Sequence, residues 1–187
     1  MEYKYHRAML DYLCSGIFAS LGQYIKRFEQ DGCRDFFDSI PYRCSQTAAK
    51  ARVRKKKWRN NACSLAELAL LPCTNNKQRH PLVQEFMLIN DSSSIAVELP
   101  VWLYERGLRK RMSGHIDVLQ VREGKIYVLD YKPDAEAQNE DKVVSQLYWY
   151  ATGLSFRSRI PLRFFRCAWF DDNIYFEFDP NAVRVVK

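Results

Sequence analysis

Residues 114–133 read GHIDVLQVREGKIYVLDYKP, and this stretch decides the fold. Apolar and β-branched residues dominate Gly114 to Val121 and again Lys125 to Tyr131. The turn residues Arg122-Glu123-Gly124 separate the two runs. Two such runs joined by a short turn containing glycine are typical of a β-hairpin. The stretch therefore predicts two paired strands.

Three charged residues, Asp117, Asp130 and Lys132, stand in these largely apolar strands. Residues two apart on a strand share a face, so Asp130 and Lys132 should point the same way and Tyr131 into the opposite layer. The hairpin should bring Asp117 near Asp130. Neighbouring carboxylates repel unless one is protonated or a cation lies between them. The pattern predicts a Mg²⁺ or Mn²⁺ site, because hard cations prefer oxygen ligands.

This arrangement suits the hydrolysis of a phosphodiester bond. A divalent cation lowers the pKa of a bound water and polarises the scissile phosphate. The ammonium of Lys132 could orient the attacking hydroxide or neutralise the charge that grows on the phosphorane. We therefore expect Asp117, Asp130 and Lys132 to be the catalytic residues of a metal-dependent phosphodiester hydrolase.

The flanking sequence completes an α/β pattern. The spacing predicts a helix beginning at Pro81, a strand over Ile95–Tyr104, a helix over about Asn139–Leu154, and strands over Leu162–Phe170 and Ile174–Phe178. The order is helix, three strands, helix, strand and a further hairpin strand. It predicts the α/β (α+β) class with a mixed sheet.

Upstream of this core, apolar residues from Met9 to Phe28 recur at spacings of three and four, which is typical of helix. The polar segment Pro72–Pro81 breaks this pattern. We therefore divide the chain into an N-terminal helical region, residues 1–75, and a core, residues 76–187. No catalytic chemistry is expected in the first region.

The charge of the chain favours a polyanionic partner. Lysine and arginine outnumber aspartate and glutamate by 29 to 22, and seven cations lie between Lys50 and Arg59. DNA or RNA is the leading partner and an anionic membrane surface the second. A solvated loop or helix explains the Lys50–Arg59 run equally well. Further cations between the first two core strands, near the expected site, could hold phosphates or be solvated: Arg106, Arg109, Lys110 and Arg111.

Membrane insertion is not expected, because no run of 18 apolar residues occurs. The six cysteines form no CxxC pair, so neither a zinc ribbon nor a redox motif is indicated. Reduced thiols in a cytoplasmic protein are the expectation, although an even count leaves disulfides open outside the cytosol.

Three motifs resemble those of a known family: Gly114-His115-Ile116-Asp117, Asp130-Tyr131-Lys132 and Gln146-Leu147-Tyr148-Trp149-Tyr150. Over about residues 80 to 180, the chain resembles the RecB-like branch of the PD-(D/E)XK nuclease superfamily, which includes CRISPR-associated exonucleases. The resemblance implies a restriction-endonuclease-like αβββαβ core and a Mg²⁺- or Mn²⁺-dependent deoxyribonuclease. It implies Asp117 and Asp130 as metal ligands, Lys132 as catalytic, and Gln146 and Tyr150 as substrate-binding residues. Tyr150 fits core packing equally well.

The resemblance also implies one more ligand, from the first helix or the first strand. His80 and Glu85 compete in the helix, and Glu98 is the candidate in the strand. Because the residue before a proline avoids helical dihedrals, His80 should lie at the helix cap and Glu85 inside the helix. We rank Glu98 and Glu85 equally and His80 below them. An iron–sulfur cluster is not expected, since only Cys167 lies beyond the motifs.

Two other functional classes remain open. The chain could be a catalytically silent nucleic-acid-binding module. It could also be a nuclease toxin or effector domain, with residues 1–75 docking a carrier or immunity protein. A helicase or defence-system partner, the choice between exonuclease and endonuclease, and the preferred strand form are not determined.

Overall fold

The computed structural model describes residues 2–31, 40, 42–44, 50–52, 55–105, 107 and 109–186. A mixed sheet organises this part of the chain, in the order β1-β5-β6-β7-β8-β9-β4, with β2 beside β6. The pairs β7–β8 and β2–β6 are parallel and the others antiparallel. Its strands are β1 (Lys4–Tyr5), β2 (Tyr42–Arg43), β4 (Lys55–Trp58), β5 (Ser94–Glu105), β6 (Lys110–Arg122), β7 (Lys125–Tyr131), β8 (Phe165–Phe170) and β9 (Tyr175–Phe178).

Residues 114–131 lie in the hairpin β6–β7, as the sequence predicted. Its turn residues Glu123 and Gly124 have φ values of 51° and 66°. A two-residue hairpin turn of the right twist needs positive φ at both central residues, which explains glycine here. The expected α/β (α+β) class with a mixed sheet is confirmed. A separate small sheet pairs β3 (Lys50–Arg52) with β10 (Arg184–Val186).

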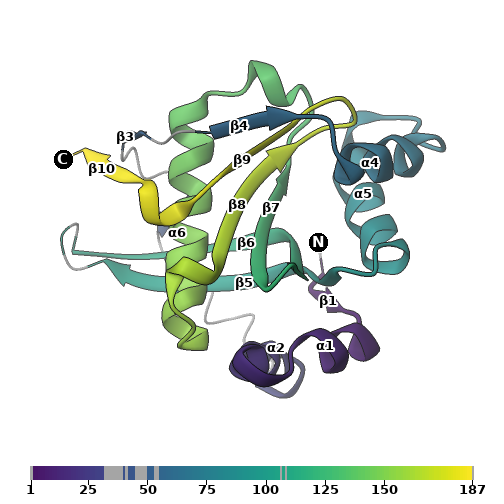
Figure 1. Cartoon of the computed structure of the whole chain (residues 1–187). Coiled ribbons are helices and arrows are strands. Elements are labelled where there is room, and N and C mark those ends of the chain that lie inside the picture. The colour runs from purple at the N-terminus through teal and green to yellow at the C-terminus, as the bar shows by residue number, and fades with distance from the viewer. Residues whose placement is uncertain are drawn as a thin grey trace.

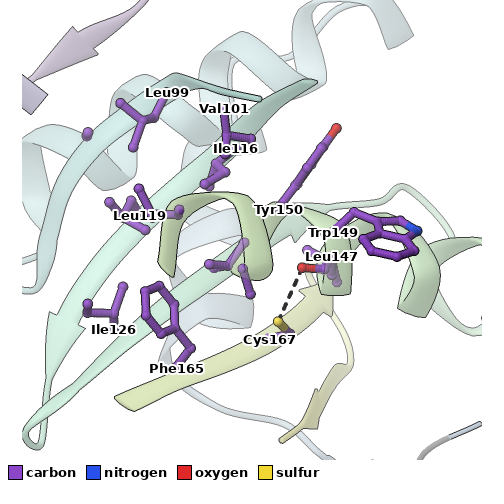
Figure 2. Close-up of a cluster of buried hydrophobic side chains, with 14 of the residues drawn as sticks. Leu99, Val101, Ile116, Leu119, Ile126, Leu147, Trp149, Tyr150, Phe165 and Cys167 are labelled. Atoms are coloured by element: carbon purple, nitrogen blue, oxygen red, sulfur yellow. Dashed lines mark hydrogen bonds between the residues drawn. The ribbon is translucent and has the colours of Figure 1, made fainter. Parts of the chain in front are cut away.

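Helices cover both faces of the large sheet (Figure 1). The helix α6 (Glu140–Ser158) packs on one face together with α1 (Arg7–Leu13) and α2 (Ala19–Asp31). The pair α4 (Asn61–Leu70) and α5 (Asn76–Asn90) packs on the other. Each face has its own hydrophobic cluster, called here the α6 cluster and the α4–α5 cluster. Figure 2 shows part of the α6 cluster, where Leu147 and Tyr150 share the core with Val101 and Ile116.

The N-terminal region is not purely helical, which corrects the expectation for residues 1–75. The strand β1 pairs with β5, and β4 forms the opposite edge of the sheet beside β9. Part of the Lys50–Arg59 run is thus a strand rather than a loop or helix. Lys55 and Lys57 form ion pairs with Glu140 and Glu136 near α6, so contacts distant in sequence override the local pattern.

The helix α5 begins earlier than the sequence suggested. Asn75 caps it by accepting a hydrogen bond from the Lys77 backbone N–H at 3.1 Å. Pro81 therefore lies inside the helix and not at its first position. This corrects the place of His80, which is a helical residue one turn before Gln84 and not a cap.

Two further expectations concern the environment of the protein. Within the ranges described, no helix is long and apolar enough to cross a membrane. Cys14, Cys44, Cys63, Cys73 and Cys167 are free thiols, and Cys33 lies outside the described residues.

Candidate active site

The hairpin brings Asp117 and Asp130 together, as the sequence predicted. The register pairs Val118 with Leu129, so the two aspartates are the next opposite residues. Their carboxyl groups are close enough to share a hydrogen bond. Asp117 Oδ2 also accepts the backbone N–H of Tyr131 at 3.1 Å. The two carboxyl groups therefore interact with each other and do not behave as independent surface groups.

Lys132, the residue that directly follows β7, lies beside the two aspartates. Its Nζ lies 2.9 Å from Asp130 Oδ2. Tyr131 points to the other side, where its hydroxyl accepts a hydrogen bond from Arg79 Nε at 3.0 Å and its ring meets that of His80 edge-on. The strand alternation therefore separates the charged pair from the aromatic residue between them.

Glu98 faces this group from β5. The register pairs Val97 with Val118 and Leu99 with Ile116, which places Glu98 opposite Asp117. Glu98 has a φ of 51°, a left-handed conformation inside a strand. Such backbone costs about 1–3 kcal/mol for a residue other than glycine, and it collects at functional sites.

Both strands change face at these two carboxylates. Val97 and Val118 pack in the α4–α5 cluster. Leu99 and Ile116, two residues away on each strand, pack in the α6 cluster on the other face. Because residues two apart normally share a face, the sheet is irregular here on two neighbouring strands. The irregularity explains how Glu98 and Asp117 leave the two cores.

The helix α5 contributes His80 and Gln84 from one face. His80 Nδ1 lies 3.4 Å from Asp117 Oδ2. The buried Gln84 donates from Nε2 to Glu98 Oε1 at 2.7 Å. Glu85 points away and pairs with Lys4 at 3.0 Å.

The sequence ranking of ligands is thus corrected, because His80 and Glu98 reach the group and Glu85 does not. Gln84 was missed altogether. Its helical spacing of four from His80 was the available signal, and the earlier start of α5 hid that signal.

Gln146 and Tyr150 lie on α6 and contact each other. Gln146 Nε2 donates to the Tyr150 hydroxyl at 3.0 Å. The Tyr150 ring is buried in the α6 cluster, so its role in packing is confirmed. Gly114 makes room for it, since a β-carbon at residue 114 would lie 2.3 Å from Tyr150 Cε1. Burial and then the Asp130 carboxyl raise the pKa of Tyr150 well above its ordinary value, so the phenol stays protonated.

The electrostatics of the site favour a bound cation. Burial raises the pKa of Asp117 to about 6, and burial together with Asp117 raises the pKa of Asp130 well above its ordinary value. Burial lowers the pKa of Lys132, but Asp130 more than offsets this, so the ammonium remains charged. Burial lowers the pKa of His80, which is therefore neutral at neutral pH. The carboxyl groups thus outnumber the nearby cations.

Asp117 and Asp130 supply carboxylate oxygens, the donors that hard cations such as Mg²⁺ and Mn²⁺ prefer. Among the described residues, no group of three or more His, Cys, Asp and Glu side chains is arranged to hold a metal ion. Asp130 Oδ2 is buried and contacts the Lys132 ammonium. Among the described residues, none donates a hydrogen bond to it with favourable geometry. Two carboxylates suffice for Mg²⁺, which completes its shell with water and phosphate oxygens.

The basic residues between β5 and β6 lie farther away than expected. Lys110 begins β6, and the seven residues from there to Asp117 span roughly 20 Å of strand. The Lys110 ammonium lies over the ring of Tyr42 at 4.5 Å. Arg106 is outside the described residues. Arg109, Lys110 and Arg111 therefore do not surround the carboxylates.

No family model, curated protein or solved structure matches this chain. The family resemblance of its motifs remains a prediction.

Proposed function

We propose that this protein is a Mg²⁺- or Mn²⁺-dependent nuclease that hydrolyses phosphodiester bonds in DNA. One observation carries the proposal: two carboxyl groups largely withdrawn from solvent, Asp117 with 14% and Asp130 with 2% of the side chain exposed, meet beside the ammonium of Lys132. Strongly shifted pKa values that arise from burial and a specific charged partner are typical of functional sites. A pair that served only stability would gain nothing from bringing two carboxylates into contact.

Each residue around this pair has a separate role in the proposed reaction. A divalent cation held by Asp117 and Asp130 would activate a water molecule and polarise the scissile phosphate. Lys132 keeps its proton, so it acts by stabilising negative charge on the phosphate oxygens rather than as a base. His80, which is neutral, can accept a hydrogen bond from the attacking water at a ring nitrogen. Gln146, half-buried beside Tyr150, offers an amide to the substrate.

The substrate is proposed from charge and from the resemblance of the motifs. The formal net charge of +7 favours a polyanion. The RecB-like motifs favour DNA over RNA. Exonuclease and endonuclease action are both compatible with these residues.

The decisive experiment incubates purified protein with circular and linear DNA, single- and double-stranded, in Mg²⁺, Mn²⁺ or EDTA. We expect cleavage with either metal, none in EDTA, and a loss of about 100-fold or more in Lys132→Ala. Lys125→Ala is the matched control. Lys125 begins β7, the strand that Lys132 follows, but its ammonium donates to the Arg163 carbonyl at 2.9 Å. The proposal fails if wild type cleaves nothing, or if Lys132→Ala cleaves as fast as wild type.

A silent nucleic-acid-binding module is the second candidate. It is favoured by the lack, within the described ranges, of any group of three or more acidic, histidine or cysteine side chains suited to a metal. This candidate predicts that the protein binds DNA equally well in EDTA and leaves it intact under every metal condition. The same cleavage assay, followed by a gel-shift measurement, separates the two candidates.

A further inference from the structure

A cavity of about 600 Å³ lies apart from the candidate active site. We call it the Trp58 pocket. It opens between β4, the turn end of β6–β7 and the beginning of α4. Its residue Tyr127 packs in the α4–α5 cluster, so the pocket is on that face of the sheet. Arg122 and Glu123 place it at the turn end of β6–β7, whereas Asp130 lies near the other end of β7. Its volume lies within the range of about 300–1,000 Å³ that small ligands occupy.

Two flat groups flank this pocket. The indole of Trp58 is 37% exposed, and its ring meets the ring of Tyr175 at 4.9 Å. The guanidinium of Arg122 lies 3.9 Å from the ring centre of Tyr127 and donates to the Tyr175 hydroxyl at 3.3 Å. The buried Tyr175 therefore lies under both groups. An exposed indole and a guanidinium plane are the surfaces on which nucleic-acid bases stack.

The lining also offers hydrogen bonds of both kinds. Asn60, Asn61 and Gln120 line the pocket, where Asn60 Oδ1 also caps α4 and Gln120 Nε2 also donates to Asp91. Arg122 Nε is buried and has no acceptor among the described residues. Because this Nε is covered by its surroundings, a ligand would meet only the exposed part of the guanidinium; 28% of the Arg122 side chain is exposed.

The charges of the pocket are nearly balanced. Lys56 and Arg122 are offset by Asp91, Glu123 and Glu177. A phosphate-binding site would need an excess of cations. The pocket therefore favours a neutral, planar ring that carries hydrogen-bond acceptors. A phenylalanine ring from a peptide would fill the space but would offer no acceptor to the exposed part of the Arg122 guanidinium.

We propose that the Trp58 pocket binds the base of a nucleotide, stacked on Trp58 with its edge toward Arg122 and the amides. The base can belong to a free nucleotide or to a single strand, because both present the same ring. This inference goes beyond the proposed nuclease activity and does not depend on it, since neither Asp117 nor Lys132 lines the pocket.

The test measures binding by calorimetry and ligand-observed NMR in EDTA, so that nothing is cleaved. The probes are deoxyadenosine, deoxyadenosine monophosphate, a short single-stranded DNA and a phenylalanine-containing peptide. Wild type should bind the nucleoside and the monophosphate with similar affinity. Trp58→Ala should weaken both by about tenfold, which corresponds to one lost base stack.

Three variants make the test specific. Trp58→Phe retains an aromatic surface and should bind within a few-fold of wild type. Tyr104→Ala removes an exposed aromatic residue on β5, outside the pocket, and should leave binding unchanged. Ser93→Phe places a ring in the lining and should block binding without removing Trp58. Thermal melts of each variant establish that it is folded.

The outcomes separate the sources of the base. If Trp58→Ala weakens the binding of the single strand as well as of the nucleoside, the pocket serves a strand. If only the nucleoside and monophosphate depend on Trp58, it serves a free nucleotide. The proposal is overturned if wild type binds no nucleoside, if Trp58→Ala binds as wild type does, or if the peptide binds more tightly than the nucleoside. Cleavage in the metal-dependent assay has no bearing on any of these results.

Discussion

Glu98 and Asp130 both oppose folding when considered as single residues. Glu98 holds a left-handed backbone conformation in a strand, and Asp130 is a carboxyl group with only 2% of its surface exposed. Neither feature improves the packing of the two hydrophobic clusters. Proteins retain such residues when a ligand or a reaction uses them. The conformation of Glu98 and the burial of Asp130 therefore point to a functional role for both residues.

Gln84 should act as a positioning residue for Glu98. Its amide donates to Glu98 Oε1 at 2.7 Å, and it is the described partner that holds this carboxylate toward Asp117. Gln84→Leu should weaken Mn²⁺ binding and the proposed nuclease rate by about 10-fold or more, as the loss of a group that orients a ligand does. Mn²⁺ titration by calorimetry, with kcat and KM measured separately, checks this.

Glu85→Gln is the matched control for Gln84. Glu85 is the next residue of the same helix, but it is exposed and pairs with Lys4. The substitution should change neither metal binding nor rate. Equal effects of the two substitutions would show that disturbance of α5, rather than the contact with Glu98, is responsible.

Asp117→Asn should stabilise the metal-free protein at neutral pH. The pKa of Asp117 is about 6 when folded, above its ordinary value, so the folded state binds this proton more tightly than the unfolded state. Stability is therefore lost as the pH rises through about 4 to 6, and the full loss is present above that range. Asparagine removes the loss, which should raise the free energy of unfolding by about 1–3 kcal/mol.

Urea unfolding in EDTA at about pH 7.5 and at about pH 4.5 measures this gain. The gain should be largest at the higher pH and fall to about a third of that value at the lower. Asp141→Asn, an exposed position in the first turn of α6, should show no gain at either pH. A gain of equal size at both pH values would contradict a buried, destabilising carboxylate.

Among the helices and strands, β6 and α6 are in close contact at Gly114. Because a β-carbon there would overlap the ring of Tyr150, Gly114→Ala should destabilise the protein by about 1–3 kcal/mol through overpacking. The same substitution should displace the Tyr150 hydroxyl and lower the proposed activity. Urea unfolding of the variant gives the stability change.

A double-mutant cycle shows whether the ring is the cause. Tyr150→Leu removes the overlapping atoms, so Gly114→Ala should cost less in that background than in wild type. Additive losses would mean that the backbone of β6, rather than contact with α6, resists the added carbon.

At the scale of the whole molecule, the sheet draws strands from both ends of the chain. The first 75 residues supply β1 beside β5 and β4 beside β9, and their helices bury Leu10, Leu21 and Ile25 in the α6 cluster. A fragment of residues 76–187 would expose both strand edges and this apolar surface. It should therefore fail to unfold cooperatively.

Circular dichroism melts of the fragment and of the full chain compare the two directly. A sharp melting transition in the fragment would support the division at residue 75 and would make the first region an independent appendage. A broad, non-cooperative signal would mean that the two regions form one folding unit.

The sequence by itself determined the central hairpin and its charged face. The alternation of Asp130, Tyr131 and Lys132, the turn at Gly124 and the stripe of α6 are local patterns, and the backbone geometry of strand and helix converts them directly into orientation. The pairing of Asp117 with Asp130 follows from the short turn, which sets the register.

The other residues of the site, the strand β4 and the Trp58 pocket could be found only from the three-dimensional structure. His80 reaches Asp117 and Gln84 reaches Glu98 because α5 begins at Asn76 and β5 changes face at Glu98, and neither event has a clear local signal. The strand character of Lys55–Trp58 depends on Glu136, Glu140 and β9, which are far away in sequence. The Trp58 pocket likewise joins segments that no periodicity connects. Such features depend on contacts between distant residues, whose free energies exceed the small local propensities that a sequence displays.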